Sequence, residues 1–445
     1  MNISLLPYLV SAYLNDGKRD QWTREQIDAH QRTALAALRQ HSYQNSPFYQ
    51  RFHKGQFNAP LHELPVMNRK IMLDNFNDLV TDRTVRLDDV RRHMQQEPGK
   101  PFKGKYWVNS TSGTTGVPAV FLYHRREWAQ VVIFLMRAYR WAGIRLSPVK
   151  KRRMAFVTST NPWHLSTQVS QTVHLPSISS MRIPANDPLP SVVSRLNEFQ
   201  PDTLIVYSSM GRILAAEQMA GHLNISPQVI MTSAEVLTPE TRQMIKDVWG
   251  VEPFDQYGTT ETAAIGCECT QHNGQHMFED ICIVENVDSQ NRPVPVGEFG
   301  EKILLTVLFN YSQPLFRYEI SDSICVSDKE CSCGRKFRLI EKVQGRQEDI
   351  LYFPNQSGEI VGIHPIVFHN VMDTVRASGW QVVQRDDGLH ILLSGSQDNG
   401  IHDKLSVSMA QALKLHGVET PPIKVSLVPS IPRLPNGKLR LVLRD

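Results

Sequence analysis

Short apolar runs alternate with amphipathic helical segments along the first part of the chain. Strand-like runs lie at 153–157, 203–207 and 228–232, and helical patterns lie at 189–199, 211–220 and 239–249. Residues 127–143 carry an apolar stripe at helical spacing, as expected for a helix that packs on a sheet. A polar helical pattern at 23–57 predicts an N-terminal helical cap. The alternation predicts an α/β fold with mostly parallel sheets flanked by helices.

The pattern changes beyond Gly300, where strand-like runs lie at 301–308, 315–317 and 324–326. The C-terminal residues combine strand-like runs at 349–353, 381–384, 390–393 and 423–428 with helical patterns at 363–378 and 399–415. This order predicts a small α+β domain. We therefore expect a large N-terminal domain at 1–345, which includes a β region at 265–340, and a small C-terminal domain at 346–445.

Length and charge narrow the class of protein. A chain of 445 residues exceeds the size at which one core usually keeps growing, so two or more domains are expected. The formal net charge is +4 without long basic runs, which gives no reason to expect nucleic acid as a partner. No run approaches the roughly 18 apolar residues of a membrane span. Residues 1–13 are apolar but lack a basic start and a cleavage site, so they predict a docking helix and a cytoplasmic protein.

A run rich in hydroxyls and glycine follows the strand-like residues 105–108. Glycine lets backbone N–H groups approach an anion, and hydroxyls donate hydrogen bonds to the same oxygens, so the run favours phosphate binding. It matches neither GxxxxGK[ST] nor GxGxxG, and an ordinary polar turn is the alternative interpretation. Its candidate residues are Ser110, Thr111, Ser112, Gly113, Thr114, Thr115 and Gly116.

A second nucleotide-type segment is Tyr257-Gly258-Thr259-Thr260-Glu261. An aromatic ring can stack on a base, a hydroxyl can bond a phosphate oxygen, and a carboxylate can hold Mg²⁺. The same residues would also suit the start of a helix, with a threonine cap and a carboxylate in the first turn.

Isolated charged residues add weaker candidates. Asp322 follows a strand-like run, where a carboxylate can accept both hydroxyls of a ribose. Arg317 and Arg346 could contact phosphate or ribose, although single arginines more often form surface ion pairs. Lys438 follows the turn Pro435-Asn436-Gly437, and a cation there could stabilise charge as pyrophosphate leaves. A C-terminal lysine can equally serve solubility.

All six cysteines fall between positions 267 and 333. Without an export signal, such clustering favours a metal over disulfides. Cys269, His276, Cys331 and Cys333 make a Cys₃His set for a structural Zn²⁺, with unligated thiols as the alternative. Cys267 and His272 are spare candidates. Cys282 and Cys325 lie in apolar runs, where a buried thiol is expected.

Five segments in this order resemble the adenylate-forming (acyl-activating) enzymes, and among them the phenylacetate-CoA ligase-like branch. They are STSGTTG at 110–116, QYGTTE at 256–261, FRYEISD at 316–322, GRQED at 345–349 and PNGK at 435–438. The resemblance implies that Tyr257 contacts adenine, Thr260 the α-phosphate and Glu261 a Mg²⁺ ion.

The same resemblance assigns further roles. It implies that Asp322 holds the ribose, that Glu235 lies in a loop beside the adenine, that Glu348 is the hinge of a swivelling domain and that Lys438 is the adenylation lysine. Members of the resembled branch also have a Cys…His pair before a CxCG sequence, as this chain does. Candidate residues for the acid pocket are Tyr207, Ser208, Ser233, Ala234 and Ala263.

The predicted reaction joins a carboxylic acid, favoured as aryl by the resemblance alone, to ATP, giving an acyl-AMP and pyrophosphate. A thiol then takes the acyl group, and coenzyme A is the preferred candidate for this thiol. The phosphopantetheine arm of a carrier protein, or an amine, is an alternative acceptor. A non-catalytic nucleotide-binding module and a metal-stabilised scaffold are the other two hypotheses, and the resemblance also implies a homodimer.

Overall fold

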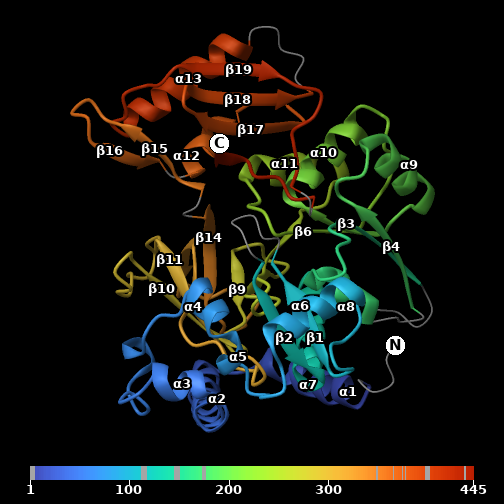
Figure 1. The fold of residues 1–445 in the computed structure, drawn as a ribbon. Helices are drawn as coiled ribbons and strands as arrows, with labels where there is room; N and C mark the ends of the chain where they lie inside the picture. Colours follow the sequence, from blue (N-terminus) through green and yellow to red (C-terminus); the bar gives the residue numbers. More distant parts are fainter. Residues whose placement is uncertain are drawn as a thin grey trace.

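The structure is a computed structural model, and its described residues are 6–111, 118–144, 151–172, 177–346, 349–363, 365–372, 374–375, 377–395, 401–434 and 437–445. Figure 1 shows a large body and, at the top, a smaller unit coloured orange to red that the C-terminal residues form. Among the described residues, no helix combines the length and apolar content that a membrane crossing needs.

A mixed sheet organises the large body. Its strands are β3 (Arg152–Thr158), β4 (Ile178–Pro184), β5 (Thr203–Tyr207), β6 (Val229–Ser233), β7 (Phe254–Tyr257), β8 (Gly266–Glu268), β9 (Gln275–Met277), β13 (Asp322–Ser327) and β14 (Leu339–Arg346). They lie in the order β13-β14-β9-β8-β7-β6-β5-β3-β4. Strands β3 to β7 pair in parallel, and the others pair antiparallel. The α/β prediction is confirmed, with an antiparallel half that the sequence patterns did not predict.

The helices of the large body cover both faces of the parallel strands. They include α7 (Arg125–Trp141), α8 (Leu165–Thr172), α9 (Leu189–Phe199), α10 (Ser208–Met219) and α11 (Pro239–Trp249). Ala155 and Val157 of β3 share an apolar cluster with α9, α10 and α11, whereas Met154 and Phe156 share another with α7. Alternate residues of a strand point to opposite faces, so the two clusters lie on opposite sides of the sheet.

Two smaller sheets complete the large body. They are the hairpin of β1 (Tyr106–Ser110) with β2 (Val120–His124), and the antiparallel β10 (Cys282–Val287), β11 (Lys302–Val307) and β12 (Tyr318–Ile320). The predicted strand at 315–317 is wrong, since β12 begins at Tyr318. Arg317 adopts a φ of 45°, and a strand cannot contain a residue in this left-handed region.

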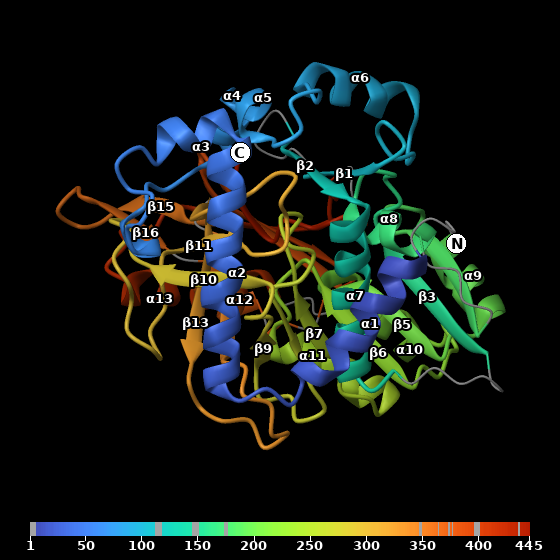
Figure 2. The same ribbon diagram turned by 90° about the horizontal axis from the view of Figure 1, so that it is seen from below.

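Helices also form the N-terminal part of the chain, where α2 (Arg24–Asn45) and α3 (Pro47–Phe52) lie within the predicted cap at 23–57. The other helices of this part are α1 (Leu6–Arg19), α4 (Arg69–Asp74), α5 (Phe76–Leu79) and α6 (Leu87–Gln96). Thr23 and Gln26 form a capping box that begins α2. Figure 2 shows α1 beside α7, with which it is in contact.

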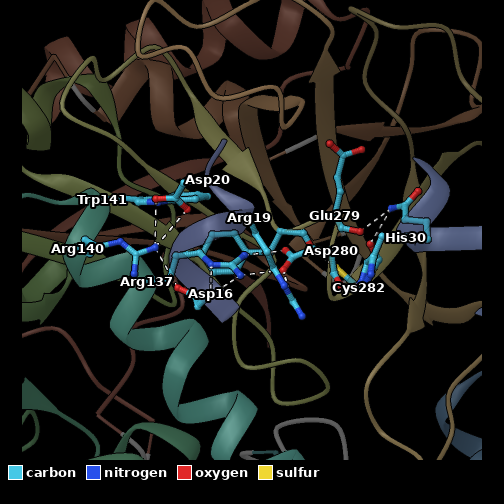
Figure 3. Close-up of polar contacts among 12 residues, drawn as sticks. Asp16, Arg19, Asp20, His30, Arg137, Arg140, Trp141, Glu279, Asp280 and Cys282 are labelled. Carbon is cyan, nitrogen blue, oxygen red and sulfur yellow. Dashed lines mark hydrogen bonds and ion pairs between the residues drawn. The ribbon is translucent and has the colours of Figure 1, made fainter. Parts of the chain in front are cut away.

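Buried ion pairs fasten α1 to the body (Figure 3). The guanidinium of Arg137, on α7, is fully buried and donates to Asp16 of α1 at 2.7 Å and to Asp280 at 2.7 and 2.8 Å. Arg19 donates to the same Asp280 carboxylate at 2.6 Å. Burial opposes the ionisation of Asp280, but Arg137 and Arg19 hold the pKa of this carboxyl well below its usual range. The charges thus compensate one another inside the protein.

The C-terminal unit has a core of its own, drawn from residues between Leu351 and Val442. Its elements are β15 (Leu351–Pro354), β16 (Ile360–Ile363), α12 (Pro365–Met372), β17 (Gly379–Arg385), β18 (Gly388–Ser394), α13 (Ile401–Leu415), β19 (Ile423–Leu427) and β20 (Val442–Arg444). Its main sheet has the order β19-β18-β17-β20. Helix α12 ends at Met372, earlier than the predicted helix at 363–378.

Candidate active site and metal centre

The carboxyl ends of the parallel strands bring many of the candidate residues to one edge of the sheet. Ser159 follows β3, Ser208 follows β5, Ala234 follows β6 and Gly258 follows β7. These strands are neighbours and run in the same direction, so the segments that follow them meet. In open α/β sheets, ligands bind outside the carboxyl ends of the strands.

The predicted adenine and ribose residues are in contact. The hydroxyl of Tyr257, at the end of β7, donates to Oδ2 of Asp322, at the start of β13, at 2.6 Å. Both side chains are buried. The bond fixes the orientation of the ring and of the carboxylate relative to each other, although the two residues are far apart in the sequence.

The segment after Tyr257 forms a tight turn and not the start of a helix. The N–H of Ala263 donates to the carbonyl of Thr259 at 2.9 Å. A Cβ at Gly258 would lie 2.5 Å from the carbonyl oxygen of Ala263, so only glycine fits there. The hydroxyl of Tyr123 donates to the carbonyls of Thr260 and Glu261, each at 2.7 Å. These contacts fix the backbone that carries the predicted phosphate and Mg²⁺ residues.

Two acid-pocket candidates have unusual backbone geometry. Ala234 and Ala263 adopt φ values of 67° and 76°, in the left-handed region that alanine rarely occupies. Residues held in such conformations gather at functional sites. Ser208, next to β5, donates from its hydroxyl to the carbonyl of Glu235 at 3.2 Å. Ser233 is the last residue of β6.

A polar cluster at the carboxyl ends of the parallel strands was not predicted from the sequence. The N–H of Ser159 donates to the Tyr207 hydroxyl at 2.9 Å, and the Ser159 hydroxyl contacts Nδ1 of His164 at 2.7 Å. Burial, and secondly the charge of Lys438, lower the pKa of His164 to about 4, so this imidazole is neutral at pH 7. The sequence signal that could have indicated this cluster was the presence of polar residues directly after a parallel strand.

Glu235 has a role that its predicted position in the adenine loop did not indicate. Its carboxylate accepts from the Ser209 N–H at 2.8 Å and from the Leu439 N–H at 2.7 Å. Leu439 is the neighbour of Lys438, so the candidate lysine lies over the carboxyl ends of the strands. Arg317, in contrast, is buried against Glu285 at 3.1 Å and donates to the Leu64 carbonyl at 2.6 Å.

Several candidates lie outside the described residues. The ends of the predicted phosphate loop are described, because Thr111 and Ala119 exchange two hydrogen bonds of 3.0 Å. Ser110 donates from its N–H to the Trp163 carbonyl at 2.9 Å. The residues outside are Ser112, Gly113, Thr114, Thr115, Gly116 and Glu348, together with the side chain of Arg346.

The four predicted zinc residues form one cluster. The ligand atoms of Cys269, His276, Cys331 and Cys333 all lie within 4.8 Å of one another. The sulfurs of Cys269 and Cys331 are 3.7 Å apart, close to the ~3.8 Å that tetrahedral Zn–S bonds of about 2.3 Å require. Nε2 of His276 is 3.2 Å from the Cys333 sulfur. This donor set fits a Zn²⁺ ion.

The surroundings of the cluster favour the metal-binding forms of His276 and Cys333, whereas burial raises the pKa of the Cys269 and Cys331 thiols. Burial lowers the pKa of His276 to about 4, which keeps the imidazole neutral. Its Nδ1 contacts the Phe337 carbonyl at 3.4 Å, which directs Nε2 to the cluster. Burial opposes ionisation of Cys333, but hydrogen bonds from Arg335 lower the pKa of this thiol. Cys267 instead bonds the Ala138 carbonyl, and His272 pairs with Glu268, so neither spare candidate belongs to the cluster.

Purified protein is expected to carry about one equivalent of zinc, as a four-ligand structural site requires. Cys331→Ser should lower the zinc content measured by elemental analysis. Cys282→Ser is the matched control, because Cys282 is buried outside the cluster. A wild-type protein that is free of metal would remove the proposed centre.

Asp255, on β7, is expected to make stability depend on pH. Burial, and secondly the charge of Glu268, raise the pKa of this carboxyl to about 7. Between about pH 4 and about pH 7 the folded protein holds a proton that the unfolded chain has released. The contribution of Asp255 to stability is therefore complete below about pH 4 and is lost as pH rises to about 7. The loss is on the order of 4 kcal/mol.

Asp255→Asn is expected to flatten this pH dependence, because the amide does not titrate. Its oxygen can accept from Gln275, which donates to Asp255 at 2.7 Å, and its N–H can donate to the Thr232 hydroxyl, which lies 2.9 Å from Asp255. Denaturant unfolding at several pH values measures the effect. The exposed Asp74→Asn is the control. An equal pH slope in Asp255→Asn and wild type would contradict the assignment.

The relatives that comparisons with known proteins find agree with the geometry of the site. No family model matches the chain. A phenylacetate-coenzyme A ligase from Thermus thermophilus is 24% identical over 450 residues, which cover 94% of this chain and 97% of that protein. Protein CapK of Staphylococcus aureus is 24% identical over 406 residues, which cover 85% and 82%.

A solved 2-hydroxyisobutyryl-CoA ligase has a similar fold. In its postadenylation state the TM-score is 0.74 at 19% identity, and the match covers 96% of this chain and 92% of that chain. In its thioesterification state the same ligase gives a TM-score of 0.58 at 19% identity over the same shares. The TM-score is thus higher for the postadenylation state than for the thioesterification state of that ligase.

Proposed function

The chain is a homologue of phenylacetate-coenzyme A ligases with the fold of the adenylate-forming superfamily, and on this premise we propose that it activates a carboxylic acid with ATP. The acid attacks the α-phosphorus, and an acyl-AMP and pyrophosphate form. A thiol, coenzyme A before other acceptors, then takes the acyl group and AMP leaves. The observation that carries the proposal is the position of Lys438, whose neighbour Leu439 is bonded to Glu235 at the edge where Tyr257 meets Asp322.

The proposed residues act by position and charge. Tyr257 and Asp322 would hold adenine and ribose, and the loop at 110–116 would hold the phosphates together with Gly258 and Thr259. Thr260 and Lys438 would stabilise the charge that develops at the α-phosphate. Glu261 offers a buried carboxylate on a fixed turn, which suits the Mg²⁺ that accompanies ATP and neutralises phosphate charge.

The acid would lie near the carboxyl ends of β5 and β6. Tyr207, Ser208, Ser233, Ala234 and Ala263 are the proposed lining, and the strained backbone at Ala234 and Ala263 supports the assignment. We propose an aryl acid because the relatives include phenylacetate-coenzyme A ligases.

For the second step we propose a rotation of residues 346–445, with the hinge at Glu348 and Arg346 beside the nucleotide. The separate apolar core of the C-terminal unit supports this division. Zinc at the Cys₃His cluster would be structural, because no step of the reaction asks for a metal-bound thiolate there. A homodimer in the cytoplasm completes the proposal.

The second step needs a test of its own, because an acyl-AMP can react with more than one kind of acceptor. A carrier-protein phosphopantetheine or an amine would receive the same acyl-AMP. Thioester or amide formation with each acceptor, measured by mass spectrometry, separates these alternatives from coenzyme A.

Acid-dependent exchange of labelled pyrophosphate into ATP tests the first step. Wild-type protein is expected to show exchange with at least one acid of a panel of aryl and aliphatic acids, and none without acid. Bound nucleotide without exchange for any acid would favour a non-catalytic nucleotide-binding module. Bound zinc with neither nucleotide nor exchange would favour a metal-stabilised scaffold.

A further inference from the structure

The first turns of α10 form a docking platform for the C-terminal unit. Ser209 and Arg212 lie on these turns and contact residues that are more than 160 positions later in the sequence. Helix α10 also contacts β17 of the C-terminal unit directly. The platform therefore belongs to the large body and faces the unit that carries Lys438.

Glu235 links the platform to the lysine turn. One carboxylate oxygen accepts from the N–H of Ser209 at 2.8 Å, and the other accepts from the N–H of Leu439 at 2.7 Å. Hydrogen bonds to a charged acceptor are among the strong ones in proteins. Because both oxygens are engaged, the carboxylate fixes the backbone next to Lys438 relative to α10.

Arg433 and Gly437 add two further contacts with the large body. Nη1 of Arg433 donates to the Ser209 hydroxyl at 3.2 Å and to the Gly437 carbonyl at 2.7 Å. Gly437 has a φ of 80°, and a Cβ there would lie 2.8 Å from Cβ of Ala185. Gly437 thus lies directly on the large body, at a distance that only glycine allows.

Arg212 holds the C-terminal unit at a separate place. Its side chain is buried, and it donates to the carbonyls of Ala377 and Val375 at 3.0 Å each. These carbonyls follow α12. Two charged side chains of the large body, one acidic and one basic, therefore bind backbone groups of the C-terminal unit.

We propose that Glu235 and Arg212 are positioning residues that hold the Lys438 turn in place for adenylation, and that their contacts must break before the acyl group is transferred. The inference rests on the proposed function. The greater similarity to the postadenylation state of 2-hydroxyisobutyryl-CoA ligase than to its thioesterification state supports it, because the two states belong to one protein.

Separate assays of the two steps test the proposal in the full-length protein. Glu235→Gln and Arg212→Met are expected to lower kcat for pyrophosphate exchange by about tenfold, the effect of losing one charge-assisted hydrogen bond. KM for ATP should stay near the wild-type value. Transfer from a synthetic acyl-AMP to coenzyme A should be slowed less than exchange, because the second step does not use this docked turn.

Hydrogen exchange supplies a readout that does not depend on activity. The Leu439 amide is expected to exchange about tenfold faster in both variants, because the docked turn opens more often. Arg195→Met is the matched control, since Arg195 lies on α9 and its contacts with Asp187 and Arg182 stay within the large body. It should leave exchange at Leu439 and the ratio of the two steps unchanged.

The outcomes are distinguishable. Unchanged amide exchange at Leu439 in both variants, or equal slowing of both steps, would overturn the positioning role. A higher KM for ATP in Glu235→Gln with no effect of Arg212→Met would instead assign Glu235 to the nucleotide alone and also overturn it. A wild-type protein that adenylates no acid would overturn the proposed function, while amide exchange would still decide whether the contacts hold the turn.

Discussion

Replacing Lys438 by alanine is expected to lower acid-dependent pyrophosphate exchange by about 100- to 1000-fold, the effect typical of removing a group that stabilises transition-state charge. The side chain follows a turn that is seated on the large body through Leu439 and Gly437. Its charge also acts on His164, which lies beyond the carboxyl end of β3. The ammonium group is therefore delivered to the edge of the sheet where ATP is proposed to bind.

Lys424→Ala is the matched control for this experiment. Lys424 belongs to the same C-terminal unit, but its side chain is more than half exposed and pairs with Asp387. The control should exchange pyrophosphate like wild type. Equal exchange by wild type and Lys438→Ala would reject the assignment of Lys438.

Replacing Arg137 by methionine is expected to lower the free energy of unfolding by about 3–5 kcal/mol, the usual cost of removing one partner from a buried ion pair. Methionine fills part of the volume but leaves the carboxylates of Asp16 and Asp280 without their shared cation. Both carboxylates are buried, so water cannot replace the lost contacts. Denaturant unfolding, followed by a probe of the large body, measures the loss.

Two companion variants make this result specific. Arg92→Met removes an exposed arginine from α6 and should change stability little. Combining Arg137→Met with Asp280→Asn should recover part of the loss, because the second change removes one of the two buried carboxylates that have lost the Arg137 charge. A fully additive double variant would show that the lost stability comes from packing and not from charge.

Patterns in the sequence predicted the elements that have regular periods. The strand at 203–207 and the helices at 189–199 and 239–249 begin and end as predicted, because short apolar runs and helical stripes report local burial. Strands β8 and β9 contain three residues each and are too short to show a period. These two strands of the antiparallel half were therefore not predictable from such patterns, whereas the predicted run at 324–326 lies within β13.

The candidate site was predictable where one segment carries its own chemistry. The spacing of the Cys and His residues predicts a cluster, and the structure brings together Cys269 and Cys331, which are far apart in the sequence. Most of the hydroxyl run lies outside the described residues, so its role stays a prediction. Contacts made by ordinary residues carry no local signal. Glu235 and Leu439 are 204 positions apart, and no pattern near either residue indicates the other. The roles of the site residues toward ATP and the acid stay predictions.

The ion pairs of α1 set an order in which the chain can mature during translation. Asp16 can pair with Arg137 only after 121 further residues have been synthesised, and Arg19 can pair with Asp280 only after 261 further residues. Helix α1 therefore completes its ion pairs only after the residues up to Asp280 have been synthesised. Until then part of its surface lacks its final contacts, and such exposed surface makes folding intermediates prone to aggregate.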